Sequence, residues 1–196
     1  MILQRLRAET AQQHEETEAE NLASKIIDHS ISLAEYKVLI LQNYVTYMAL
    51  ENVITPVLQE HLLTDESQFL SHEKSEQLAL DLKVLHMGSN YPTQELQLPQ
   101  INNLAQALGA LYVIEGSMLG GMMIGEHLPK CEALKEITAF HFFTKDKKEV
   151  AERWRNFCSM IRSENLSDKE IEEVIESAKN TFAFFSQVFH KVLATA

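Results

Sequence analysis

Cysteine, glycine and proline are all scarce in this chain of 196 residues. Its two cysteines, Cys131 and Cys158, lie too far apart in the sequence to form a disulfide framework or a C-x-x-C pair for zinc or redox chemistry. Six glycines and four prolines are few for a β-rich protein, which needs many tight turns. These absences favour a helical protein of a reducing compartment, and the cytoplasm is the expected location.

Basic residues are in the minority, since 17 Lys and Arg stand against 28 Asp and Glu, for a formal net charge of −11. Binding to DNA, RNA or an anionic membrane surface requires a basic face, so this balance argues against such partners. The first 20 residues lack the apolar core of a signal peptide. No apolar run approaches the roughly 18 residues of a membrane span. We therefore expect no nucleic-acid partner and no membrane partner.

Apolar residues recur at helical spacing along almost the whole chain, and neither a repeat nor an interdomain linker interrupts them. The pattern predicts an all-α, single-domain bundle of about seven or eight helices over residues 1–196. Two capping boxes, at residues 32–35 and 167–170, predict helix starts, and Pro56 predicts a kink in the helix that follows the first of them. The remaining expected helices are 2–20, 71–86, 100–128 and one that begins at Thr144 or Asp146.

Five of the six glycines fall within the helical segment 100–128, at Gly109, Gly116, Gly120, Gly121 and Gly125. Each costs about 1 kcal/mol relative to alanine inside a helix, so some gain must offset roughly 4 to 5 kcal/mol. One explanation is close helix–helix packing. The other is a bent helix that brings bare backbone against a flat ligand. The adjacent pair Gly120-Gly121 favours the bend, and with it a planar, bulky ligand.

His14 is the candidate metal ligand, because Leu3, Leu6 and Thr10 predict that it lies on an inward helix face. Glu18 follows one helical turn later, where its carboxylate can reach the imidazole. A carboxylate on one ring nitrogen fixes the tautomer and makes the other nitrogen a better ligand. The alternative is a surface histidine or a hydrogen-bonded core histidine, which is the commoner situation for a single histidine.

Two segments together resemble the heme oxygenase family. Residues 6–18, LRAETAQQHEETE, resemble its N-terminal helix, which carries the axial heme ligand, and residues 108–121, LGALYVIEGSMLGG, resemble its kinked distal helix. The likeness is greatest to the bacterial branch that makes biliverdin, some members of which supply phytochromes. The resemblance implies that His14 is the iron ligand and that Glu18 is its hydrogen-bonding partner.

The same resemblance implies roles around the rest of the ring. Gly116 and Gly120 would lie over the distal face, with Gly121 completing the bend. Many family members carry an aspartate at the position of Ser117, so the water network near bound oxygen must be built differently here. The resemblance places Arg7 on one heme propionate. Three arginines on the helix before the C-terminal one are candidates for the second propionate: Arg153, Arg155 and Arg162. Tyr112 and Phe182 are candidates for contact with the macrocycle.

The implied activity is cleavage of heme b, which is both substrate and cofactor, to biliverdin, carbon monoxide and ferrous iron. The reaction uses O2 and electrons from a ferredoxin or a reductase, and a phytochrome is a possible acceptor of biliverdin. Three alternatives stay open. A non-catalytic heme carrier would share the fold, a thiaminase-like enzyme would need a nucleophilic cysteine in its pocket, and a structural protein would use its glycines for packing alone.

Overall fold

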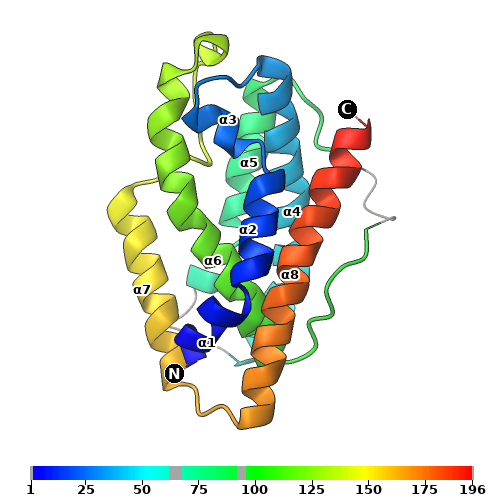
Figure 1. Cartoon of the computed structure of the whole chain (residues 1–196), viewed down its shortest axis with the longest axis vertical. Helices are drawn as coiled ribbons and strands as arrows, with labels where there is room; N and C mark the ends of the chain where they lie inside the picture. The colour runs from blue at the N-terminus through cyan, green and yellow to red at the C-terminus, as the bar shows by residue number, and fades with distance from the viewer. Residues whose placement is uncertain (1, 62–67, 92–95, 196) are drawn as a thin grey trace.

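The computed structural model describes residues 2–61, 68–91 and 96–195, and within them all regular secondary structure is helical, without a strand (Figure 1). Eight α-helices follow one another, with short 3-10 helices at 68–70, Leu128–Lys130 and Glu132–Leu134, which confirms the predicted all-α class and helix number. Their bounds are α1 Ile2–Glu9, α2 Ala11–Glu20, α3 Ala23–Ile27, α4 Leu33–His61, α5 Glu73–Val84, α6 Leu104–His127, η2 Leu128–Lys130, η3 Glu132–Leu134, α7 Lys147–Ser163 and α8 Asp168–Thr195.

Three helices begin at the predicted caps. Ser32 and Glu35 bond each other's backbone N–H groups before α4, and Ser167 and Glu170 do the same before α8. The Asp146 carboxylate accepts from two N–H groups at the start of α7. Pro56 lies inside the 29-residue helix α4, as predicted. The capping residues thus fix where the long helices begin.

The N-terminal segment departs from the expected single helix over residues 2–20. Thr10, with φ −108° and ψ 3°, separates α1 from α2. Its hydroxyl donates to the carbonyl of Leu6 at 2.7 Å, a local bond that competes with regular helix geometry. Thr10 is 2% exposed, so this break is buried inside the molecule.

Both N-terminal helices run along α8 in the same chain direction. Arg5 pairs with Glu172 at 2.7 Å, and at the other end Glu20 lies 3.5 Å from His190. Between these contacts the hydroxyls of Thr17 and Ser186 are 3.4 Å apart. In Figure 1, α2 consequently lies in front of the bundle, between α8 and α6.

Helix α6 is the centre of the bundle and packs against α3, α4, α7 and α8. It changes direction along its length in Figure 1. The expectation that no apolar run reaches the length of a membrane span is wrong here, because Leu104–Lys130 is long enough and contains an 18-residue window with a mean hydropathy of 1.5. In this structure 56% of that window is buried, which is typical of the core helix of a bundle.

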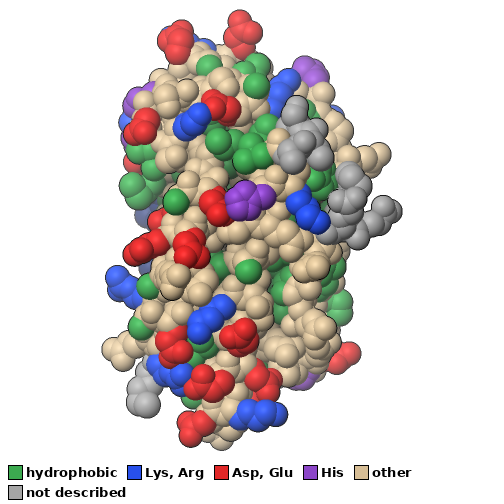
Figure 2. All heavy atoms as spheres, turned by 45° about the vertical axis from the view of Figure 1, so that its right-hand side comes forward, with side chains coloured by type: hydrophobic (Ala, Val, Ile, Leu, Met, Phe, Trp, Pro, Cys, Tyr) green, Lys and Arg blue, Asp and Glu red, His purple; other side chains and the backbone are tan. Residues whose placement is uncertain are grey.

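The surface carries the excess of acidic residues. Figure 2 shows Asp and Glu side chains spread over the face that includes α8, with Lys and Arg interspersed among them. On this face the charges are of mixed sign and form no basic stripe of the kind that nucleic acids require.

Candidate functional site

Tyr112 on α6 marks the place where the N-terminal helices approach α6. Burial raises the pKa of Tyr112, while a hydrogen bond with Thr10 and the positive charge of Arg7 oppose that rise. Both residues therefore lie next to the phenol. Arg7 itself is exposed. The helix break at Thr10 thus has a tertiary partner on α6.

A second contact joins the other end of this region. Helix α3 packs against α6, and Nε2 of His29 lies 2.9 Å from Nδ1 of His127. Between the two contacts α2 and α6 run in the same direction (Figure 1). Since His14 follows Thr10 by one helical turn and Gly116 follows Tyr112 by one turn, the structure brings the two sequence motifs to the same stretch of the molecule.

His14 lies on the surface of this region, and its side chain is 55% exposed. The side chain that the sequence pattern placed on an inward helix face is thus exposed in this structure. Its Nδ1 is 3.5 Å from the carboxylate of Glu18, which is 70% exposed. The ring meets Phe182 of α8 edge-on, with centroids 5.8 Å apart. Because Glu18 and Phe182 orient the ring through Nδ1 and one edge, Nε2 is left as the nitrogen for a ligand.

The five glycines of α6 divide into two groups. A Cβ at Gly109 would lie 2.1 Å from the carbonyl oxygen of Val174, and one at Gly125 would lie 2.0 Å from that of Phe143. These two glycines allow close backbone packing, which is the first of the two explanations for the cluster. Packing therefore accounts for both ends of the cluster and not for its middle.

The middle glycines have more room. No atom of the described residues lies within 4 Å of a Cβ built at Gly120, whereas one at Gly116 meets only the ring of Trp154 at 3.6 Å. Gly121 is buried, and a Cβ there would touch Phe143 at 3.6 Å. Gly120 thus presents bare backbone, while Gly116 packs against Trp154 and Gly121 packs against Phe143.

Ser117 is held by a residue that the sequence analysis did not single out. Its hydroxyl donates to the carbonyl of Ile114 at 2.8 Å and lies 2.6 Å from the hydroxyl of Tyr47 on α4. Since the serine proton is already engaged, Tyr47 donates to Ser117. Burial raises the pKa of Tyr47, so its phenol stays protonated. No local pattern signals this pair, because the two residues are 70 positions apart.

A buried ionic cluster lies directly beside Gly116. The Glu115 carboxylate, in a residue 2% exposed, accepts from Lys74 at 2.7 Å and from two nitrogens of Arg153 at 2.7 and 2.9 Å. Burial alone would raise the pKa of Glu115, but Lys74 and Arg153 outweigh it and leave that pKa below its ordinary value. Arg153 is therefore paired with Glu115, which favours Arg155 and Arg162 over it as candidates for the second propionate.

The remaining aromatic predictions concern α8. Phe182 is 8% exposed and contacts His14, while Phe184, Phe185 and Phe189 belong to the hydrophobic core.

Cys131 is buried at the far end of α6, where its thiol contacts backbone carbonyls. Burial raises the pKa of Cys131, which disfavours the thiolate that a thiaminase-like nucleophile would need.

The donor set indicates which kind of metal the region suits. In the described part of the chain, no group of three or more His, Cys, Asp and Glu side chains could hold a metal ion. A site with one imidazole suits a metal that brings its other ligands with it, as porphyrin iron does. His14 and the open backbone at Gly120 are compatible with such a planar group.

Comparison with known proteins places this geometry in a family. The heme oxygenase family model matches residues 1–191. The structure resembles the NO- and CO-bound heme oxygenase of Neisseria meningitidis, with a TM-score of 0.78, 22% identity and coverage of 99% of this chain and 92% of that one. It also resembles heme oxygenase-1 of the cyanobacterium Synechocystis in complex with heme, with a TM-score of 0.67, 15% identity and coverage of 99% and 93%. No curated protein matches the sequence. The structural likenesses show a shared fold, and the family match over nearly the whole sequence shows that the chain belongs to the heme oxygenase family.

Proposed function

We propose that this member of the heme oxygenase family, an oxidoreductase of heme degradation, holds heme b between α2 and α6 and opens it to biliverdin, carbon monoxide and ferrous iron. The observation that carries the proposal is the pairing of His14, whose Nε2 is available, with the bare backbone at Gly120. The roles of the individual residues are argued below.

On the proximal side, His14 would bind the iron through Nε2. Glu18, whose carboxylate is 3.5 Å from Nδ1, is placed to orient the imidazole so that Nε2 faces the iron. Phe182 contacts the imidazole edge and limits its rotation. A neutral imidazole donates less electron density than a thiolate, so it does not favour early cleavage of an O–O bond.

On the distal side, the wall is built from backbone and neutral hydroxyls. Heme supplies the iron at which O2 binds. Ser117, the residue after Gly116, receives a hydrogen bond from Tyr47, and both hydroxyls are uncharged near neutral pH. This pair can orient water and pass a proton without placing a strong acid beside the iron. The pair stands where many family members carry an aspartate, and it provides hydroxyl groups without a negative charge.

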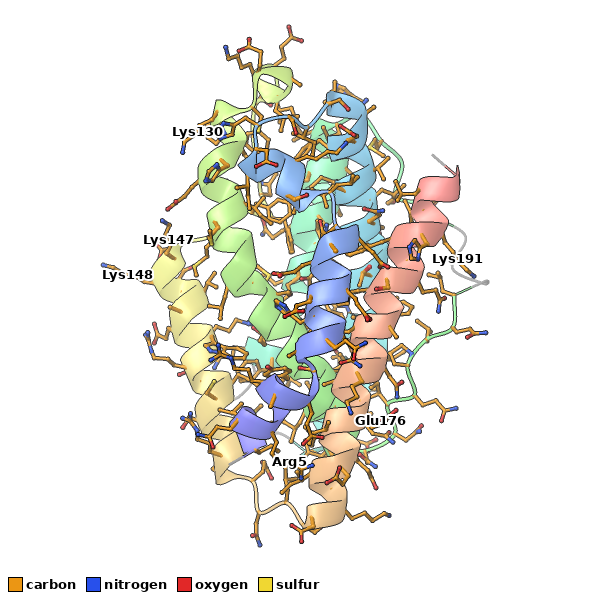
Figure 3. All side chains as sticks on the ribbon, viewed as in Figure 1. Arg5, Lys130, Lys147, Lys148, Glu176 and Lys191 are labelled. Atoms are coloured by element: carbon orange, nitrogen blue, oxygen red, sulfur yellow. The ribbon has the colours of Figure 1, made fainter. Side chains whose placement is uncertain are left out.

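The proposal extends to the heme propionates, the electron donor and the acceptor of biliverdin. Arg7 is exposed beside Tyr112, where its guanidinium can bind a propionate in a bidentate manner. Arg155 and Arg162 remain candidates for the second propionate. An external ferredoxin or reductase would supply the electrons, and a phytochrome would accept biliverdin. Figure 3 places Lys130, Lys147 and Lys148 on one flank, near the end of α6 and the start of α7, which is a basic feature that an acidic donor could approach.

The direct test is to titrate the protein with hemin and then add ascorbate or a reductase in air. A heme oxygenase first develops a Soret band and then loses it, while biliverdin absorption rises. A Soret band that persists under reductant would identify a heme carrier, and the absence of any Soret shift would identify a structural protein.

Filling the space at Gly120 should weaken heme binding. We expect Gly120→Leu to lower heme affinity about tenfold or more, because the isobutyl group takes up volume that the ring needs. Stability of the heme-free protein should not fall, since leucine is a better helix former than glycine and the site is open. Gly88, which also has no neighbour within 4 Å among the described residues, provides the control Gly88→Leu, for which heme affinity should stay unchanged. Wild-type affinity in Gly120→Leu would contradict the placement of the ring.

Removing the hydroxyl of Tyr47 should slow turnover without weakening heme binding. Tyr47→Phe deletes the proton donor to Ser117 and keeps the aromatic packing against Phe142 and Phe185. General acid–base groups typically contribute about 100-fold or more, so single-turnover rates should fall by about 100-fold. Equal rates in the variant and the wild type would show that protons reach the distal side by another route.

A further inference from the structure

The cluster around Glu115 joins four helices at one point of the distal wall. Glu115 of α6 binds Lys74 of α5 and Arg153 of α7. The carboxylate of Glu51 on α4 accepts from the backbone N–H groups of Lys74 and Ser75, each at 3.2 Å, and so fixes the start of α5. Glu51, Lys74 and Glu115 are each no more than 5% exposed. A shift of one member therefore disturbs all four helices.

Arg153 is followed in the chain by Trp154, and this tryptophan touches the proposed distal wall. Its Cζ3 lies 3.6 Å from the position of a Cβ on Gly116, and its ring is 5.8 Å from that of Tyr112. On the other side it stacks on Phe157, with centroids 5.5 Å apart and planes at 28°. The two parallel hydrogen bonds between Arg153 and Glu115 therefore hold the backbone that carries Trp154.

We propose that Glu115 is a positioning residue that, through Arg153, sets Trp154 against Gly116 and thereby determines which edge of the heme is open to attack. The inference rests on the proposed function, because it assigns a role in that same site. The indole occupies the α7 side of the first distal glycine, whereas the space at Gly120 is open. Trp154 would therefore block the approach at Gly116, while the space at Gly120 would remain open to a ligand.

The choice of an ionic anchor over an apolar one is consistent with this role. A buried ion pair adds little net stability compared with well-packed apolar side chains, but its directional bonds specify one geometry. A bidentate guanidinium–carboxylate pair fixes distance and angle together.

Glu115→Gln tests the proposal, since glutamine keeps the shape of the side chain and removes its charge. Trp154 is the single tryptophan, so the emission spectrum of the heme-free protein reports its surroundings directly. We expect a red shift of that emission, a changed ratio of biliverdin isomers on chromatography, and kcat/KM lower by roughly 10- to 100-fold. A residue that only stabilised the fold would lower the unfolding midpoint and leave the isomer ratio and the emission unchanged.

Arg153→Lys is the second variant, because it keeps the buried charge and loses the paired hydrogen bonds, and it decides the question if Glu115→Gln does not fold. Lys145→Gln is the matched control, since it breaks the Lys145–Glu73 ion pair at the rim of the cluster and leaves the bonds of Glu115 intact. Wild-type isomer ratio and emission in Arg153→Lys would overturn the proposal. Failure of the proposed function would be seen separately, as heme that the wild-type protein does not convert.

Discussion

Replacing His14 with alanine is expected to abolish the imidazole-ligated, low-spin heme spectrum and to lower turnover by at least about 100-fold. Loss of residues that merely orient a metal ligand costs 10- to 100-fold, so loss of the ligand itself should cost more. The heme-free variant should keep its helical circular dichroism, because the side chain is 55% exposed and contributes little to the core. Absorption spectra of the ferric and CO-bound forms measure the first effect, and bilin formation measures the second.

Two further variants make this result specific. His190→Ala is the matched control, since His190 is also exposed and also lies 3.5 Å from a glutamate, Glu20, but belongs to a different helix, α8. Its heme spectrum should equal that of the wild type. Glu18→Gln should keep the spectrum and reduce turnover less than His14→Ala does, because it alters the orientation of the ligand and not its identity. An unchanged spectrum in His14→Ala would refute the axial assignment, and added imidazole should restore the spectrum if the assignment is right.

The helical architecture was predictable because the signals for it are local. Apolar spacing identifies helices wherever one face is buried, and the Ser32 and Ser167 capping boxes mark two helix starts within a few residues. The break at Thr10 was not predictable in the same way. It depends on a side-chain bond to Leu6 and on a contact with Tyr112, about a hundred residues away. Such tertiary partners leave no periodic trace in the sequence.

The candidate site also combines features that local spacing predicts with features that depend on tertiary contacts. His14 with Glu18, and Gly116 with Gly120, are each one turn apart and can be found by spacing alone. Their roles as iron ligand, ligand partner and distal backbone stay predictions. The pairs that organise the surroundings join residues 38 to 70 positions apart, and only the folded chain reveals them. Glu115 did leave one signal, because it is a charged residue inside an otherwise apolar helical segment. A buried charge of that kind requires a partner, although the sequence does not say which.

Alanine substitutions at Gly125 and at Gly120 are expected to change the free energy of unfolding in opposite directions. Gly125→Ala should lower the free energy of unfolding by about 3 kcal/mol, because the new methyl group would lie 2.0 Å from the carbonyl oxygen of Phe143 and would force α6 away from the segment before α7. Gly120→Ala introduces the same methyl group where no described atom lies within 4 Å, so it should raise the free energy of unfolding by up to about 1 kcal/mol through helix propensity.

Urea denaturation of the two heme-free variants measures both effects against the wild type. Equal changes in the two variants would mean that helix propensity alone governs these positions and that the close approach at Gly125 relaxes without cost. Opposite changes would mean that the chain retains glycine at Gly125 for packing, since alanine there is a steric fault. At Gly120 the glycine would then cost stability that alanine could provide. The open space at this position supports one reason for that cost, which is a ligand that needs the bare backbone.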